Sequence, residues 1–225
     1  MKKYKLIRSN RKTISLKIKN DATLEVRAPF KLVEEEIDKF VRSKEDWINK
    51  HIAKVVISSK EKQDFTLNFG DYVRIIGKET IIKPISGDIA KYENDSFLIP
   101  KECDFNQIKE IIIQLSKEIA KIYITKRVIF FKEKLEVEPS KVKITNAKKR
   151  WGSCSSKNSL NFSWRIIMGD SDVIDYVVVH ELAHIKHLNH SKKFWAEVEK
   201  ILPNYKDTIK KLRKLEEKFS KEDWD

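Results

Sequence analysis

Four histidines in one short segment of this sequence indicate metal chemistry. Of the five histidines in the chain, these four fall within eleven residues, at His180, His184, His187 and His190. Glu181 directly follows the first of them and completes the pattern HExxH. Imidazole nitrogens are common zinc ligands, and this pattern is typical of helices that carry a zinc-dependent hydrolytic site.

The spacing of His180 and His184 requires a helix to bring the two rings together. Side chains four residues apart lie one above the other on one face of an α-helix. The segment 172–187 is predicted to be such a helix, because Ser171 can cap its first turn and apolar residues recur on one of its faces. The Glu181 carboxylate would then lie beside the metal, where a general base can take a proton from water.

A catalytic zinc site needs a third protein ligand and one open position. His187 shares the helix with His180 but lies about 10 Å further along its axis, and three successive turns do not easily surround a tetrahedral ion. His190 is the favoured third ligand, because residues 188–189 can break the helix and Ser191 can cap the next one. The chain could then fold back toward the metal.

Other polar side chains could complete or assist this site. Glu197 and Glu199, in a helix predicted at 191–201, are alternative ligands. Cys154 is interpreted as structural, since a fourth protein ligand would close the site to water. The developing oxyanion of a hydrolytic reaction also needs a stabilising group. Three candidates remain open for that role: Tyr205, Arg150 and Asn161.

The chemistry expected of this set is hydrolysis by an activated water. Zinc on neutral imidazoles lowers the pKa of bound water toward ~7. Glu181 would accept the proton and return it to the leaving amine. The sequence therefore predicts a zinc-dependent peptidase or amide hydrolase, with Zn²⁺ on His180, His184 and His190 and with Glu181 as the catalytic base.

The elements around the motif predict an α+β fold in two parts. Residues 1–100 show the alternation of short strands, interrupted by helical spacing over 31–57. Residues 101–225 begin with a long helical pattern over 104–134, followed by a small sheet and three helices that include the HExxH helix. We therefore expect a strand-rich N-terminal half packed on a catalytic half, with the boundary at Pro100.

A strand predicted at 159–164 precedes the motif helix and could line the cleft. Its free edge could pair with an extended peptide substrate, although an ordinary core strand explains the same alternation equally well. Just upstream, Gly152 permits a bulge or the close approach of another group to the backbone.

Composition places the chain among folded globular proteins. Its 225 residues are 40% hydrophobic and 10% aromatic, which excludes a disordered chain. No apolar run approaches the ~20 residues that cross a bilayer, and the first residues lack the apolar stretch of a secretory signal. Two cysteines, Cys103 and Cys154, exclude a four-cysteine zinc site and are expected to be free thiols. We therefore expect a cytoplasmic protein with no membrane partner.

The net charge of +13 suggests a different function. Residues 1–20 hold eight Lys and Arg and residues 140–157 hold six, and neither segment contains an acid. If the two segments lay together, they would attract nucleic acid, although solvated basic strands explain them too. The charge therefore allows two alternatives, a nucleic-acid-associated protein with a structural zinc or a peptidase acting on DNA-bound proteins. A third alternative, a small-molecule amidase, would use the same histidine site.

The motifs together resemble those of the YgjP-like metallopeptidases, often described as metal-dependent hydrolases. The shared sequences are HELAH at 180–184, NHS at 189–191, FW at 194–195 and RWGSCS at 150–155. The resemblance implies a zincin-like catalytic half, zinc on His180, His184 and His190, a catalytic Glu181, and a peptide or protein substrate. That family is also related to SprT-like and gluzincin-type peptidases, and the SprT-like resemblance suggests substrates among DNA-bound proteins.

Overall fold

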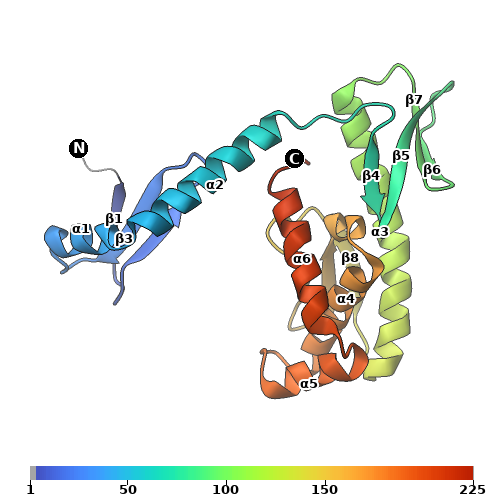
Figure 1. The fold of residues 1–225 in the computed structure, drawn as a ribbon. Helices are drawn as coiled ribbons and strands as arrows, with labels where there is room; N and C mark the ends of the chain where they lie inside the picture. The colour runs from blue at the N-terminus through green and yellow to red at the C-terminus, as the bar shows by residue number, and fades with distance from the viewer. Residues whose placement is uncertain (1–3, 225) are drawn as a thin grey trace. The chain divides into compact units, whose positions relative to one another are not determined.

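The computed structural model describes residues 4–224, which form six α-helices, one short 3-10 helix and three small sheets (Figure 1). The architecture is α+β, as the sequence predicts. Contacts divide the chain into two compact units. Unit 1 comprises the chain up to Phe65 together with Lys218–Asp223, and unit 2 comprises Thr66–Glu217 with Trp224.

Unit 1 contains a three-stranded sheet and two helices. Its elements are β1 (Lys5–Ser9), β2 (Ser15–Ile18), β3 (Leu24–Pro29), α1 (Glu34–Arg42) and α2 (Glu45–Gln63). The central strand β3 pairs parallel with β1 and antiparallel with β2. Val26 and Ala28 of β3 are fully buried against Ile37 of α1 and Ile48 of α2, so the predicted hairpin and helix pair share one core.

Unit 2 begins with a four-stranded sheet in the order β4-β5-β7-β6. Its strands are β4 (Tyr72–Ile75), β5 (Lys78–Ile85), β6 (Lys91–Glu93) and β7 (Ser96–Pro100). The Ile76 N–H donates to the Ile167 carbonyl at 2.7 Å, and Arg74 pairs with Asp170 at 2.7 Å. These bonds tie the sheet to the helical part of the unit, so contacts divide the chain before this sheet rather than after Pro100.

A long helix supports the motif helix. Helix α3 (Phe105–Leu135) begins at a capping box between Asp104 and Gln107, and it packs against α4 (Ser171–Lys186) and the 3-10 helix η1 (Trp164–Met168). Arg127 of α3 donates twice to the Asp175 carboxylate of α4, at 2.5 and 2.8 Å, and both side chains are largely buried. This bidentate pair fixes α4 on α3.

The sheet beside α4 has the order β8-β10-β9. Its strands are β8 (Lys141–Thr145), β9 (Gly152–Cys154) and β10 (Ser159–Ser163). β10 is the central strand, parallel to β8 and antiparallel to β9. The prediction that the strand at 159–164 has a free edge for a peptide is therefore wrong, and the alternative of an ordinary core strand is confirmed. Among the described strands, β9 pairs with β10 alone and forms the edge next to α4. Helices α5 (Lys192–Ile201) and α6 (Tyr205–Phe219) follow α4.

The structure also bears on two predictions made from the sequence, the absence of a membrane-spanning segment and a shared basic surface. None of the helices within residues 4–224, α3 included, combines the length and the apolar character needed for a membrane crossing. The basic segments 1–20 and 140–157 fall in unit 1 and unit 2 respectively, with residues 1–3 outside the described part of the chain. Neither unit by itself joins them, and a shared basic surface stays a prediction.

Candidate metal centre

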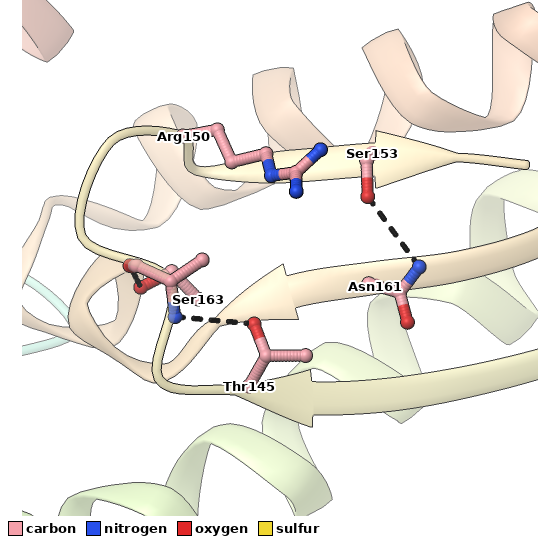
Figure 2. Close-up of a pocket in the computed structure, with 7 residues that line it drawn as sticks. Thr145, Arg150, Ser153, Asn161 and Ser163 are labelled. Atoms are coloured by element: carbon pink, nitrogen blue, oxygen red, sulfur yellow. Dashed lines mark hydrogen bonds between the residues drawn. The ribbon is translucent and has the colours of Figure 1, made fainter.

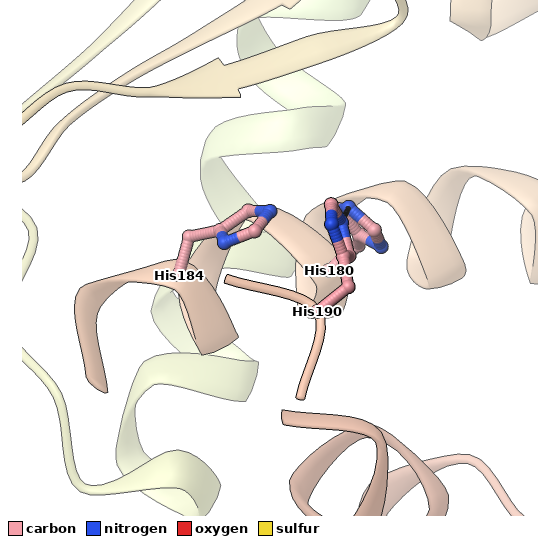
Figure 3. A group of neighbouring side chains, drawn as sticks. All are labelled: His180, His184 and His190. Carbon is pink, nitrogen blue, oxygen red and sulfur yellow. Dashed lines mark hydrogen bonds between the residues drawn. The ribbon is translucent and has the colours of Figure 1, made fainter. Parts of the chain in front are cut away.

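Three of the four clustered histidines converge in space (Figure 3). His180 and His184 come from successive turns of α4, and His190 comes from the segment that follows it. One ring nitrogen of each lies within 4.8 Å of the others. The Nε2 atoms of His180 and His190 are 3.0 Å apart, close to the roughly 3.3 Å between two nitrogen ligands of one tetrahedral zinc ion. The donor set therefore fits a divalent transition metal.

The chain reverses between α4 and α5 and thereby places His190. α4 ends at Lys186, and Ser191 caps α5 by accepting a hydrogen bond from the Phe194 N–H. His190 immediately precedes this cap, so its ring turns back toward α4, as the break in the sequence pattern predicts.

The fourth histidine contributes through its backbone. The His187 carbonyl lies 3.0 Å from Nδ1 of His184. With the proton on Nδ1, this contact leaves Nε2 of His184 unprotonated, which is the form that binds a metal. Among the described residues, the side chain of His187 is not part of the three-histidine cluster.

An aromatic layer supports the three rings. Phe194 is fully buried, and its ring centroid lies 4.6 to 4.9 Å from those of all three histidines. Trp195 stacks on His190 at 5.7 Å, and Tyr205 stacks on Trp195 at 5.3 Å. Helices α5 and α6 therefore restrict the imidazoles from the side. The sequence pattern did not predict this role for Phe194 and Trp195, although the pair follows His190 by only four and five residues.

Glu181 lies against the backbone of β9. The side chain is 6% exposed, and a Cβ atom added at Gly152 would come within 2.6 Å of its Cγ and Oε1 atoms. Because Gly152 has no side chain, the Glu181 carboxylate can lie directly against its backbone, which is the close approach that the sequence predicts. Cys154 follows on the same short strand, is a free thiol, and lies outside the histidine cluster among the described residues.

Burial dominates the electrostatics of the metal-free site. It raises the pKa of Glu181 to about 7, and the charge of Arg150 partly opposes this shift. Burial, followed by the neighbouring His184 and His190, lowers the pKa of His180 to about 3. Burial also lowers the pKa of His184, whereas the hydrogen bond between its Nδ1 and the His187 carbonyl raises that pKa. The rings of His180 and His184 are therefore neutral at physiological pH and available as ligands.

A cavity of about 350 Å³ opens at this cluster. Its walls are β9, the three histidines, Glu181 and the exposed Leu188. Burial, and then the charge of Glu181, raises the pKa of the Cys154 thiol in this wall. The cavity thus joins a potential metal site, a buried carboxylate and a strand edge.

The remaining candidates lie elsewhere. Glu197 pairs with Lys186 at 3.8 Å, Glu199 pairs with Lys206 at 3.9 Å, and neither belongs to the cluster. Of the three candidates for the oxyanion, Tyr205 is in the aromatic stack. Arg150 and Asn161 line a neighbouring cavity (Figure 2).

Comparisons with known proteins point to the same chemistry. A family model described as YgjP-like, metallopeptidase domain, matches residues 12–215. The chain is similar to the crystal structure of the metallopeptidase zymogen of Methanocaldococcus jannaschii jannalysin, with 26% identity, coverage of 41% of this chain and 96% of that chain, and a TM-score of 0.37. The chain is also similar to the crystal structure of the metallopeptidase zymogen of Pyrococcus abyssi abylysin, with 23% identity, coverage of 42% of this chain and 90% of that chain, and a TM-score of 0.35. These TM-scores are too low to support a conclusion, and no curated protein matches the chain.

Proposed function

We propose that this chain, which belongs to the YgjP-like family of metallopeptidases, is a zinc-dependent peptidase in which Glu181 is the general base. The observation that carries the proposal is the convergence of three imidazole nitrogens within 4.8 Å beside that buried carboxylate. His180, His184 and His190 would hold the ion. Three neutral nitrogen ligands with one open position are the donor set of catalytic rather than structural zinc.

Each side chain has a defined task in this proposal. A zinc ion in such a site supplies Lewis acidity, which makes water easier to deprotonate and a carbonyl more electrophilic. Glu181 takes the proton of the attacking water and delivers it to the nitrogen of the leaving amine. Its burial against Gly152 keeps the carboxylate in one place, and the His187 carbonyl holds the tautomer of His184.

The substrate in this proposal is an extended peptide that lies along β9. Within the described sheet, β9 uses one edge to pair with β10, and its residues form a wall of the cavity. An extended chain added to that strand gains main-chain hydrogen bonds that do not depend on sequence. The scissile bond would then lie between β9 and the histidines.

Metal analysis combined with a cleavage assay tests the proposal. The purified full chain should hold one zinc per molecule and cleave a fluorescent casein, and a chelator should stop cleavage until zinc is added back. Glu181→Gln should keep the zinc and lose cleavage by roughly 100-fold or more, because general-base catalysis contributes about 10²–10⁴.

Glu197→Gln is the matched control. It removes a carboxylate on α5 that lies outside the histidine cluster and should leave both zinc content and rate unchanged. A Glu181→Gln protein that cleaves casein at the unaltered rate, or a chain that binds no zinc, would refute the proposal.

A further inference from the structure

A second cavity of about 320 Å³ adjoins the histidine cavity (Figure 2). The two cavities share Gly152 and Ser153 of β9 as lining residues. The volume of the second cavity is at the lower end of the range found for small-molecule binding sites. A substrate that lies along β9 would therefore pass this second cavity as it reaches Glu181.

Two hydroxyl groups in the second cavity already donate to the backbone. Ser163 donates to the Ala147 carbonyl at 2.7 Å. Thr145 donates to the Phe162 carbonyl at 3.3 Å. These two side chains therefore build the wall and have no hydrogen left for a ligand.

Three other side chains keep unused donors. Among the residues that the structure describes, the Asn161 amide makes one long hydrogen bond, 3.4 Å, to the Ser153 hydroxyl, and its second N–H and the hydroxyl hydrogen remain available. Arg150 is exposed, and within residues 4–224 its guanidinium forms no ion pair with a carboxylate. Figure 2 shows the Asn161 amide directed at the Ser153 hydroxyl of the neighbouring strand, and Arg150 just before that strand.

The charge around the cavity favours an anion. None of its lining residues is acidic, and residues 140–157 contain six basic residues and no acid. A planar carboxylate matches the two parallel N–H groups of a guanidinium. A lysine side chain would be repelled by Arg150, and an apolar side chain would displace water from the donors of Asn161 and Ser153 without offering them an acceptor.

We propose that this second cavity is a carboxylate subsite, in which Arg150 binds one carboxylate of the peptide substrate with help from Asn161 and Ser153. The subsite would select which bond reaches Glu181. This inference rests on the proposed peptidase function. The carboxylate can come from an acidic side chain near the scissile bond or from the C-terminus of a short peptide.

Matched fluorogenic peptides test the subsite in the zinc-loaded full chain. In the first group of peptides, Glu, Gln or Lys is placed at one position beside the cleaved bond, and each position is tested in turn. The second group compares peptides that have a free C-terminal carboxylate with the same peptides ending in an amide. At one position, or at the C-terminus, the carboxylate peptide should have a kcat/KM about 10-fold above its amide counterpart, as expected for one charge-assisted pair. The set that shows the difference identifies the source of the carboxylate.

Substitutions of Arg150 then assign the preference to this side chain. Arg150→Gln should remove the preference mainly through KM, and Arg150→Glu should reverse it in favour of Lys. Lys149→Gln makes the same change in charge at the neighbouring residue, which does not line the cavity, and should leave the preference intact. A kcat that falls equally for all peptides in Arg150→Gln would assign Arg150 to the reaction itself and overturn the subsite.

Direct binding separates this inference from the peptidase proposal. The same peptides are titrated into the Glu181→Gln protein while the side-chain amide signal of Asn161 is followed by NMR. Binding that favours the carboxylate peptide supports the subsite even if the unaltered chain cleaves nothing. Equal binding of carboxylate and amide peptides refutes it even if casein is cleaved.

Discussion

Gly152→Ala should disable the proposed active site without changing any of the proposed metal ligands. The added Cβ would lie 2.6 Å from Oε1 and 2.8 Å from Cδ of Glu181, whereas ordinary contact begins at 3.4 Å. The carboxylate must therefore move by about 0.8 Å or more. The Glu181 side chain is buried, so the move also disturbs the groups packed around it.

The size of the effect follows from that displacement. A misplacement of about 1 Å in a reacting group can cost around 100-fold in rate, and overpacking a core costs about 1–3 kcal/mol. We expect Gly152→Ala to lower kcat on casein about 100-fold and to reduce the free energy of unfolding in urea by about 1–3 kcal/mol. Zinc content should not change, because the three atoms nearest to the new methyl group all belong to Glu181 and none to a histidine.

A double-mutant cycle isolates the cause. Glu181→Ala deletes the Cγ, Cδ and Oε1 atoms that the new methyl group would meet. In that background, Gly152→Ala should cost little further stability, because only residues in contact couple strongly. Equal destabilisation with and without the Glu181 side chain, or a Gly152→Ala enzyme of normal rate, would refute the close packing of Glu181 on β9.

Two further predictions concern the neighbours of the site. His187→Ala should retain zinc affinity in a competition titration with a chelator, because the contact of this residue is made by its backbone carbonyl. Arg127→Ala should destabilise the chain by about 2 kcal/mol in urea near neutral pH, since it leaves the Asp175 carboxylate half-buried without its cation. Burial already raises the pKa of Asp175, so this cost should shrink as the pH falls and the carboxyl group becomes protonated.

The sequence predicted the motif helix and its neighbours well, because those signals are local. The apolar period predicted α4 to within one residue, and the break after it indicated that His190 lies near His180. The predicted cap was wrong, because Asp170 is the N-cap and Ser171 is the first residue of the helix. Helical spacing over 104–134 likewise gave α3. Periodicity and caps lie within the segment they describe, so no distant partner is needed to recognise them.

Strand order and chain division could not be predicted in the same way. The alternation of 159–164 looks the same in a central and in an edge strand, and the actual edge, β9, has only three residues. Pro100 is a strong local break, yet the bond from Ile76 to Ile167 joins segments far apart in the sequence. Such pairings depend on the whole fold, as does the placement of Arg150 and Asn161 in a second cavity.

The register of β9 links the two proposals physically. Gly152 faces Glu181, and Ser153, the next residue, turns to Asn161, its partner across the strand pair. Because side chains alternate along a strand, a slip of one residue would aim the Ser153 side chain at Glu181 and remove the gap that the glycine leaves. It would also take the hydroxyl away from the carboxylate subsite. One strand register therefore positions the proposed base and the proposed subsite, and a change in β9 should alter both rate and specificity.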